Sequence, residues 1–415
     1  MLEMTSRERV REALEHREPD RVPIDFGAMR ATGIHAIAYN NLKKYLGIKE
    51  GQTKVCDLMQ QLAEPEMNIL EIMGGDVLQL HRLSLRFGIK LNEDWKPWRL
   101  SDGSDCLVPE GFNPMENEKG ELEIKDGDDV IAKMPRNGLY FDKFIHPYEN
   151  VKTKNDIDKI PLSEITEEEL NWLEKEARKL YEETDYALLG NFGGRVFGGG
   201  GEDWGYERYY IELGLDSDLI KYYLYRLSEN YLKDLKKYLE CVGKYIDIIM
   251  FGDDLGSQNN SLISVDMYKK MIKPHHTKLY RYVRDNYPKV KVFLHSDGSI
   301  YNLIPELIDA GVEILNPVQI SAANMDPKLL KRNFGKDLVF WGGGCNTQTT
   351  LNSGTVEDVK EEVEKLIKIF APGGGYVFNQ VHNIQANVSP EKIMAMYETA
   401  QKVGGQIYKN SHMKT

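Results

Sequence analysis

Histidine, cysteine, aspartate and asparagine side chains recur at the ends of short apolar runs in the second half of the chain. Each run is typical of a buried strand, and the polar residues follow it directly. Imidazole nitrogen and thiolate sulfur are donors that zinc prefers, and a catalytic zinc commonly has three protein ligands and one open position. The pattern therefore predicts a zinc site formed by His295, Cys345 and His382, each of which ends a separate run.

Two aspartates accompany these predicted ligands. His295 and Asp297 are two residues apart, so their side chains face the same side if the strand continues. Asp254 ends the preceding apolar run. A ligating histidine usually donates its second N–H to a carboxylate or carbonyl. We therefore expect Asp254 or Asp297 to complete or orient the metal shell, and to position a proton during catalysis.

Four further polar residues are expected to contact substrate near the same place. Asn191 and Asn316 end apolar runs of their own, and His81 follows the earlier run DVLQL. Arg30 is the one arginine in the stretch DFGAMRATGIH. These side chains would come together only if the runs that precede them end at a common surface.

The order of the apolar segments predicts an α/β protein. Six apolar runs alternate with amphipathic helices after about residue 160, which is typical of parallel strands buried on both faces. With room for two more units upstream, this repeat favours a (β/α)8 TIM barrel over an open sheet, whose G-x-G-x-x-G fingerprint is missing. The strand ends of such a barrel share one concave mouth, which would gather the polar residues.

We expect one domain over 1–415, with a helical N-terminal part at 1–87 and a hairpin-rich insertion at 88–150. The main βα units are predicted over 160–408. The glycine-rich stretch 193–201 lacks the Lys-Ser/Thr pair of a phosphate loop and is predicted to be a flexible loop.

Composition narrows the possible partners and the compartment. The chain has 53 basic and 65 acidic residues, a net charge of −12, which disfavours nucleic acid and anionic membranes as partners. No apolar run approaches the roughly 18 residues of a membrane span, and four scattered cysteines indicate free thiols in the cytoplasm. Four tyrosines share one predicted helix, which favours a packing face or a homo-oligomer contact over a substrate site: Tyr222, Tyr223, Tyr225 and Tyr231.

Five long motifs resemble those of the uroporphyrinogen decarboxylase-like superfamily. They are TSRERVREALEHREPDRVPIDFG, FGDDLGSQNNSLIS, FLHSDGSIYNLIPELIDAGVEILNPVQ, FWGGGCNTQTTL and VFNQVHNIQANVSPEKI. The resemblance covers essentially the whole chain and implies the barrel fold. The superfamily contains decarboxylases and corrinoid-dependent methyltransferases, so membership alone does not decide the reaction.

The site residues favour the methyltransferase branch. The decarboxylases carry an arginine-rich R-Q-A-G-R segment, where this chain has only Arg30. The thiol-methylating methyltransferases carry a zinc pattern, H-x-C followed later by a cysteine, whose positions fall here on His295, Asp297 and His382. Because fewer thiolates leave zinc a stronger Lewis acid, the resemblance implies removal of a methyl group from a poor donor, such as an aromatic methyl ether.

The resemblance thus implies a zinc-dependent methyltransferase of the O-demethylase type. It would transfer the methyl group of a small methylated donor to the Co(I) of a corrinoid held by a partner protein, since no cobalamin-binding D-x-H-x-x-G occurs here. Two alternatives stay open. One is a decarboxylase of the uroporphyrinogen type, which would need an aspartate such as Asp76 near the pocket and no metal. The other is a non-catalytic partner subunit.

Overall fold

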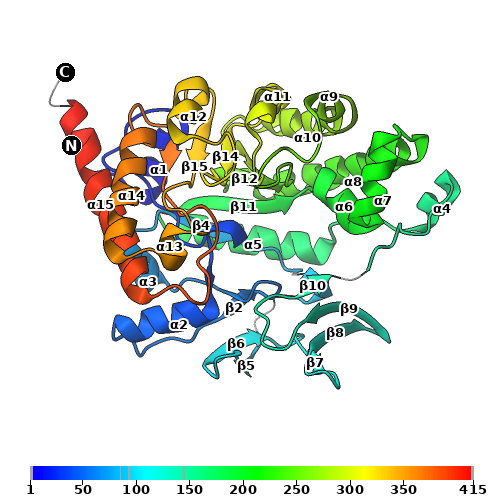
Figure 1. The fold of residues 1–415 in the computed structure, drawn as a ribbon, viewed down its shortest axis with the longest axis horizontal. Coiled ribbons are helices and arrows are strands. Elements are labelled where there is room, and N and C mark those ends of the chain that lie inside the picture. The colour runs from blue at the N-terminus through cyan, green and yellow to red at the C-terminus, as the bar shows by residue number, and fades with distance from the viewer. Residues whose placement is uncertain (1–2, 85, 92–93, 144, 413–415) are drawn as a thin grey trace.

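The computed structural model describes residues 3–84, 86–91, 94–143 and 145–412. Its centre is a parallel sheet that curls into a barrel, in the order β16-β15-β14-β13-β12-β11-β4 (Figure 1). Its strands are β4 (Val77–Leu80), β11 (Ala187–Gly193), β12 (Ile248–Gly252), β13 (Lys291–His295), β14 (Ile314–Asn316), β15 (Val339–Trp341) and β16 (Tyr376–Val377). The predicted α/β class is confirmed.

A short extended segment at Ile24 occupies the eighth position of the barrel. Ile24 forms a parallel bridge with Phe378, which follows β16. On the other side, the Asp76 N–H, just before β4, donates to the Ile24 carbonyl at 2.7 Å. The segment therefore joins the two edges of the sheet, and the predicted TIM barrel is confirmed, with one strand reduced to this bridge.

Helices surround the barrel (Figure 1). Those that follow barrel strands are α5 (Glu167–Glu183), α8 (Asp218–Val242), α10 (Lys273–Asn286), α11 (Ile304–Ala310), α12 (Pro327–Phe334), α14 (Val356–Phe370) and α15 (Pro390–His412). Shorter helices are α4 (Lys154–Lys159), α6 (Phe197–Trp204), α7 (Tyr206–Gly214), α9 (Val265–Met267) and α13 (Thr350–Ser353). Within the described ranges, none of the helices combines the length and apolarity that a bilayer crossing requires.

Alternate residues of each barrel strand point inward, as the two-residue period of a strand requires. The inner positions form an apolar cluster that includes Leu189, Ile248 and Phe293. Val10 and Leu14 of α1 (Ser6–Leu14) belong to the same cluster and pack under the amino ends of the strands. Apolar packing thus fills the barrel and its amino end, which leaves the carboxyl end for polar chemistry.

The first 87 residues are less helical than predicted. They contain α1, α2 (Ala36–Tyr45) and α3 (Met67–Met73), but also β4 and a small antiparallel sheet of β1 (Ile34–His35), β2 (Val55–Asp57) and β3 (Leu62–Ala63). Strands β1, β2 and β3 have only two or three residues, and they lie outside the repeat of apolar runs and helices that marks the short barrel strands, so the sequence did not indicate them.

Antiparallel hairpins follow β4, and Figure 1 shows them on one side of the barrel. Strands β5 (Trp95–Arg99) and β6 (Asp105–Pro109) pair, and a second sheet contains β7 (Met115–Glu116), β8 (Leu122–Asp126), β9 (Asp129–Met134) and β10 (Asp142–Lys143). Residues 92–93 and 144 of the predicted insertion lie outside the described residues. The Tyr140 hydroxyl donates to Gln385, which connects the insertion to the loop after β16.

The glycine-rich stretch is mostly helix, so the prediction of a flexible loop is wrong. Helix α6 begins at Phe197, whose N–H donates to Asp253 at 2.8 Å. A Cβ atom on Gly200 would lie 2.4 Å from the ring of Tyr209, and one on Gly201 would lie 2.4 Å from Tyr206. The glycines are therefore required by close packing of α6 against α7.

Candidate active site

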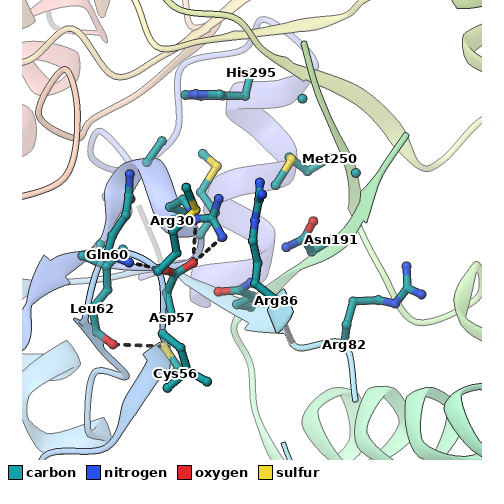
Figure 2. A pocket seen from close by; sticks show the side chains of 18 of the residues that line it. Arg30, Cys56, Asp57, Gln60, Leu62, Arg82, Arg86, Asn191, Met250 and His295 are labelled. Carbon is teal, nitrogen blue, oxygen red and sulfur yellow. Dashed lines mark hydrogen bonds and ion pairs between the residues drawn. The ribbon is translucent and has the colours of Figure 1, made fainter. Parts of the chain in front are cut away.

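A cavity of about 470 Å³ lies at the carboxyl ends of the barrel strands (Figure 2). Its volume is within the range of small-molecule sites. Most of the predicted site residues line it: Arg30, His81, Asn191, Asp254, His295, Asp297 and His382.

Three of these residues form a compact group of metal-capable side chains. His295 ends β13, Asp297 follows it, and His382 lies in the loop after β16. Their ligand atoms all lie within 4.8 Å of one another. His295 Nε2 is 3.5 Å and His382 Nε2 is 3.8 Å from Asp297 Oδ2. Donors bound tetrahedrally to one zinc are about 3.5 Å apart, so this set of two imidazoles and one carboxylate fits a catalytic zinc with an open position.

Cys345 does not join this group, which differs from the predicted ligand set. Gly342 and Gly343 have φ values of 99° and 70°, so the chain leaves β15 in a turn that breaks the strand alternation. The Cys345 thiol is fully buried and donates to Glu362 on α14, outside the cavity. Burial raises its pKa well above the ordinary value. Asp297, considered from sequence as a completing or orienting carboxylate, takes the place expected for the thiol.

Asn316 also differs from its prediction, because it lies behind His295 and not at the cavity surface. The two residues are neighbours in the register of β13 and β14, so they face the same side. Asn316 Oδ1 accepts from His295 Nδ1 at 2.7 Å, while its Nδ2 donates to the Trp341 carbonyl at 2.9 Å. Since an amide oxygen only accepts, His295 Nδ1 carries the proton and Nε2 points to the cavity.

Replacing Asn316 with alanine is expected to weaken zinc binding by about 10- to 100-fold, the range for losing an outer hydrogen bond to a ligating histidine. Competition with a chromophoric chelator measures this affinity. Asn191→Ala, at another strand end lining the cavity, is the matched control and should retain wild-type affinity. Equal affinities for the two variants would contradict the orienting role of Asn316.

Comparison with known proteins supports the resemblance seen in the motifs. The profile of the family described as uroporphyrinogen decarboxylase (URO-D) matches residues 145–403, more than half of the chain. The chain belongs to the uroporphyrinogen decarboxylase family. No match is found among curated proteins.

A likeness to one solved structure covers nearly the whole length of this uroporphyrinogen decarboxylase family member. A methyltransferase from Methanosarcina mazei is 16% identical, with 96% of this chain and 99% of that chain covered and a TM-score of 0.61. The Ignisphaera aggregans GH53 catalytic domain is 11% identical, with coverages of 91% and 99% and a TM-score of 0.36. The first likeness shows that the two chains share a fold.

Asp254 stands beside the histidine–aspartate group of this family member. Its Oδ1 is 3.7 Å from His295 Nε2 and accepts from the Asp297 N–H at 3.2 Å. The loops that carry the two aspartates touch through their backbones: a Cβ on Gly298, which has a φ of 91°, would lie 2.3 Å from Gly256. Glycine is therefore required there to hold the two carboxylates close together.

The loop that carries His382 is fixed from both sides. Val381 N–H donates to the Cys345 carbonyl at 2.9 Å, and Asn383 Nδ2 donates to Gln60 Oε1 at 2.8 Å. Cys345 thus supports the site through its backbone, while its sulfur points elsewhere.

Electrostatics couple the imidazoles to the carboxylates in the metal-free chain. Burial would lower the pKa of His295, but Asp297 and then Asp254 raise it to about 9. Burial would raise the pKa of Asp297, but His295 lowers it to about 2. For His382, burial lowers the pKa although Asp297 opposes the shift. At neutral pH the metal-free pair is therefore His295⁺ and Asp297⁻.

This ion pair predicts a pH dependence of stability in the metal-free protein. Because the folded pKa of His295 lies above its ordinary value of 6.5, the pair stabilises fully below pH 6.5 and is lost as pH rises through about 9. We expect the free energy of unfolding to fall by on the order of 1–3 kcal/mol over that window relative to His295→Gln. Urea unfolding of the wild type and of His295→Gln at pH 6.5 and 9.5 measures this fall. An equal change in the free energy of unfolding in both proteins would contradict the prediction.

Sequence reasoning missed several charged residues that line the cavity. They are Asp57, Arg82, Arg86, Arg195 and Glu202. Asp57 ends the short strand β2, which was not predicted, and Glu202 lies in α6. Arg82, Arg86 and Arg195 follow the recognised runs DVLQL and YALLGNFGG, but only His81 and Asn191 were predicted from those runs. The available signal was the pair Arg82 and Arg86 shortly after the run DVLQL.

Proposed function

We propose that the protein is a zinc-dependent methyltransferase that removes the methyl group of a small methylated donor, an aromatic methyl ether, and transfers it to the Co(I) of a corrinoid on a partner protein. The observation that carries the proposal is the group His295, Asp297 and His382 at the cavity. The likeness in fold to the Methanosarcina mazei methyltransferase supports it.

The donor set suits departure of an oxygen leaving group. Two neutral imidazoles and one carboxylate cancel only one of the two charges of a zinc ion. Zinc held by these side chains would supply a Lewis acid for the developing phenolate charge. A set with two thiolates would cancel both charges and would favour activation of a bound thiol instead.

The remaining residues hold and orient the donor. In this proposal Asp254, whose carboxyl is 44% exposed and 3.7 Å from His295 Nε2, holds a water or proton next to the departing oxygen. Asn191 lines the cavity from β11, and His81, 3.5 Å from Glu64, lines it from the end of β4. Fixing the donor in this way matters because methyl transfer requires an in-line approach of the acceptor.

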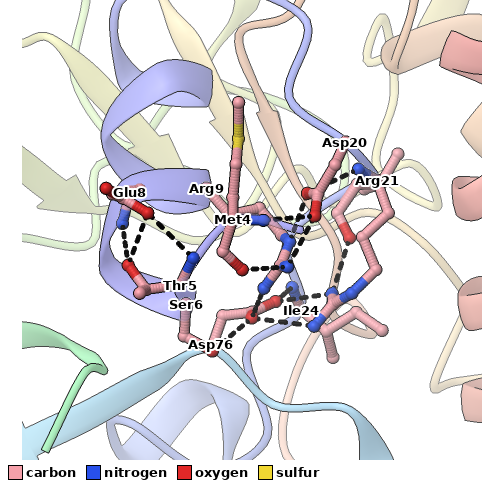
Figure 3. Close-up of polar contacts among 10 residues, drawn as sticks. Met4, Thr5, Ser6, Glu8, Arg9, Asp20, Arg21, Ile24 and Asp76 are labelled. Atoms are coloured by element: carbon pink, nitrogen blue, oxygen red, sulfur yellow. Dashed lines mark hydrogen bonds and ion pairs between the residues drawn. The ribbon is translucent and has the colours of Figure 1, made fainter. Parts of the chain in front are cut away.

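The position of Asp76 speaks against the decarboxylase alternative. Asp76 precedes β4 and so lies at the amino end of the barrel, opposite the cavity. Figure 3 shows its carboxylate enclosed by Arg9, Arg21 and the Ile24 N–H. Asp76 is fully buried and cannot meet a substrate in the cavity.

A direct assay tests the proposal. The zinc-loaded protein is incubated with cob(I)alamin, as a stand-in for the partner's cofactor, and with a panel of methoxylated aromatics and methylamines. We expect methylcobalamin to form with a methoxylated aromatic, and formation to stop when zinc is removed with a chelator. Absence of methylcobalamin with every donor, or equal rates with and without zinc, would contradict the proposal.

A further inference from the structure

Three guanidinium groups that line the cavity, those of Arg30, Arg86 and Arg195, share two carboxylates as their ion-pair partners. Arg30 Nε donates to Asp57 Oδ2 at 2.6 Å, and Arg195 pairs with Glu202. In the ion pairs of the described residues, Arg86 shares that same Glu202, at 3.5 Å. Three cations thus face two carboxylates, and Arg86 has the weakest pairing of the three.

Arg86 is held in surroundings that disfavour its charge. Its side chain is 28% exposed. Burial lowers the pKa of Arg86, the neighbouring Arg30 lowers it further, and Glu202 opposes the shift while Arg195 adds to it. A partly buried charge without a full partner has a desolvation cost. An anion that entered the cavity would remove this cost.

The guanidinium of Arg86 extends towards the candidate metal group. Figure 2 shows it between Arg30 and Asn191, pointing to the side of the cavity where Met250 and His295 lie. Arg82, by contrast, points away in the same view and pairs with Glu169. A ligand anchored on Arg86 would therefore present its other end to His295 within the same cavity.

We propose that Arg86, flanked by Arg30, binds a carboxylate of the methyl donor, so that the preferred donors are methoxylated aromatic acids and not neutral ethers. The inference rests on the proposed function and specifies its substrate class. A guanidinium offers two parallel N–H donors, which match the two oxygens of a carboxylate. The aromatic ring would then span the cavity, with its methoxy group beside His295.

Binding measured by calorimetry tests this assignment. The two ligands are 3-methoxybenzoate and its neutral methyl ester, and the proteins are wild type, Arg86→Gln and Arg86→Lys. We expect wild type to bind the acid about 10- to 100-fold more tightly than the ester, the range for hydrogen bonds to a charged group. Arg86→Gln should lose this preference. Arg86→Lys should keep only part of it, because an ammonium does not offer the two parallel N–H donors of a guanidinium. Arg178→Gln, on the exposed face of α5, controls for the change in net charge.

Each arm is also run after zinc removal, because a carboxylate could bind zinc itself. If the protein without zinc still binds the acid more tightly than the ester, the result supports the role of Arg86 independently of the reaction that the protein catalyses. Equal affinity for acid and ester, or an unchanged preference in Arg86→Gln with a normal circular dichroism spectrum, would overturn the inference. If methylcobalamin forms equally well from the ester, the methyltransferase proposal stands and the substrate class is wrong. If the acid binds through Arg86 but no donor is demethylated, the inference stands and the proposed function fails.

Discussion

Replacing His382 with alanine is expected to reduce bound zinc from about one ion per chain to a small fraction. It should also slow methyl transfer by roughly 10²- to 10³-fold. A Lewis acid contributes several kcal/mol to stabilising the departing charge, and each tenfold in rate corresponds to about 1.4 kcal/mol. His382 supplies one of three donors that lie within 4.8 Å of one another, and two donors alone form an incomplete site. Elemental analysis and the cob(I)alamin assay measure the two effects.

The matched control is Cys345→Ser. Serine can still donate to Glu362, as the buried thiol does, so the fold should be preserved. Because the sulfur lies outside the cavity, the variant should keep one zinc and wild-type turnover. A loss of zinc in Cys345→Ser together with normal zinc in His382→Ala would refute the assignment of the ligands.

The second large effect is expected on stability. The Asp76 carboxylate accepts from Arg9 at 2.7 Å, from Arg21 at 2.7 Å, from Ser6 at 2.7 Å and from the Ile24 N–H at 2.8 Å (Figure 3). Asp76→Ala would leave Arg9, only 4% exposed, as a buried cation with fewer partners. Removing one member of a buried ion pair costs about 3–5 kcal/mol. The midpoint of denaturant unfolding should fall accordingly, since the network also joins the Ile24 segment to β4.

Two further variants test whether the unpaired buried charge causes the loss of stability in Asp76→Ala. Asp105→Ala removes a carboxylate of an exposed pair with Arg99, where both side chains are about four-fifths exposed, and should leave the midpoint unchanged. Adding Arg9→Met to Asp76→Ala should recover part of the loss, because the unpaired cation is then gone. Equal midpoints for Asp76→Ala and Asp105→Ala would contradict the role of the network.

The barrel and part of its site could be predicted because parallel strands bring their carboxyl ends together. His295 and Asp297 follow β13, and the rule that alternate residues share a face placed both at the mouth. His382 was found in the same way, at the end of the last apolar run. The eighth barrel position could not be found, because Ile24 lies in a bridge and has no strand periodicity.

Cys345 and Asn316 show where the same rule fails. Two left-handed glycines after β15 turn Cys345 away from the mouth, and the sequence does not reveal the direction of such a turn. Asn316 does face inward, but the larger His295 lies over it and takes its hydrogen bond. Arg86 was missed because it lies several residues beyond the end of β4, whereas His81, which was predicted, follows that strand directly.

X-ray absorption at the zinc edge of the purified, zinc-loaded protein tests the ligand assignment most directly. Coordination by His295, Asp297 and His382 predicts a first shell of nitrogen and oxygen only, at about 2.0–2.2 Å, with the outer-shell pattern of two imidazoles. A sulfur neighbour at about 2.3 Å would place Cys345 or another thiol on the metal and contradict this account.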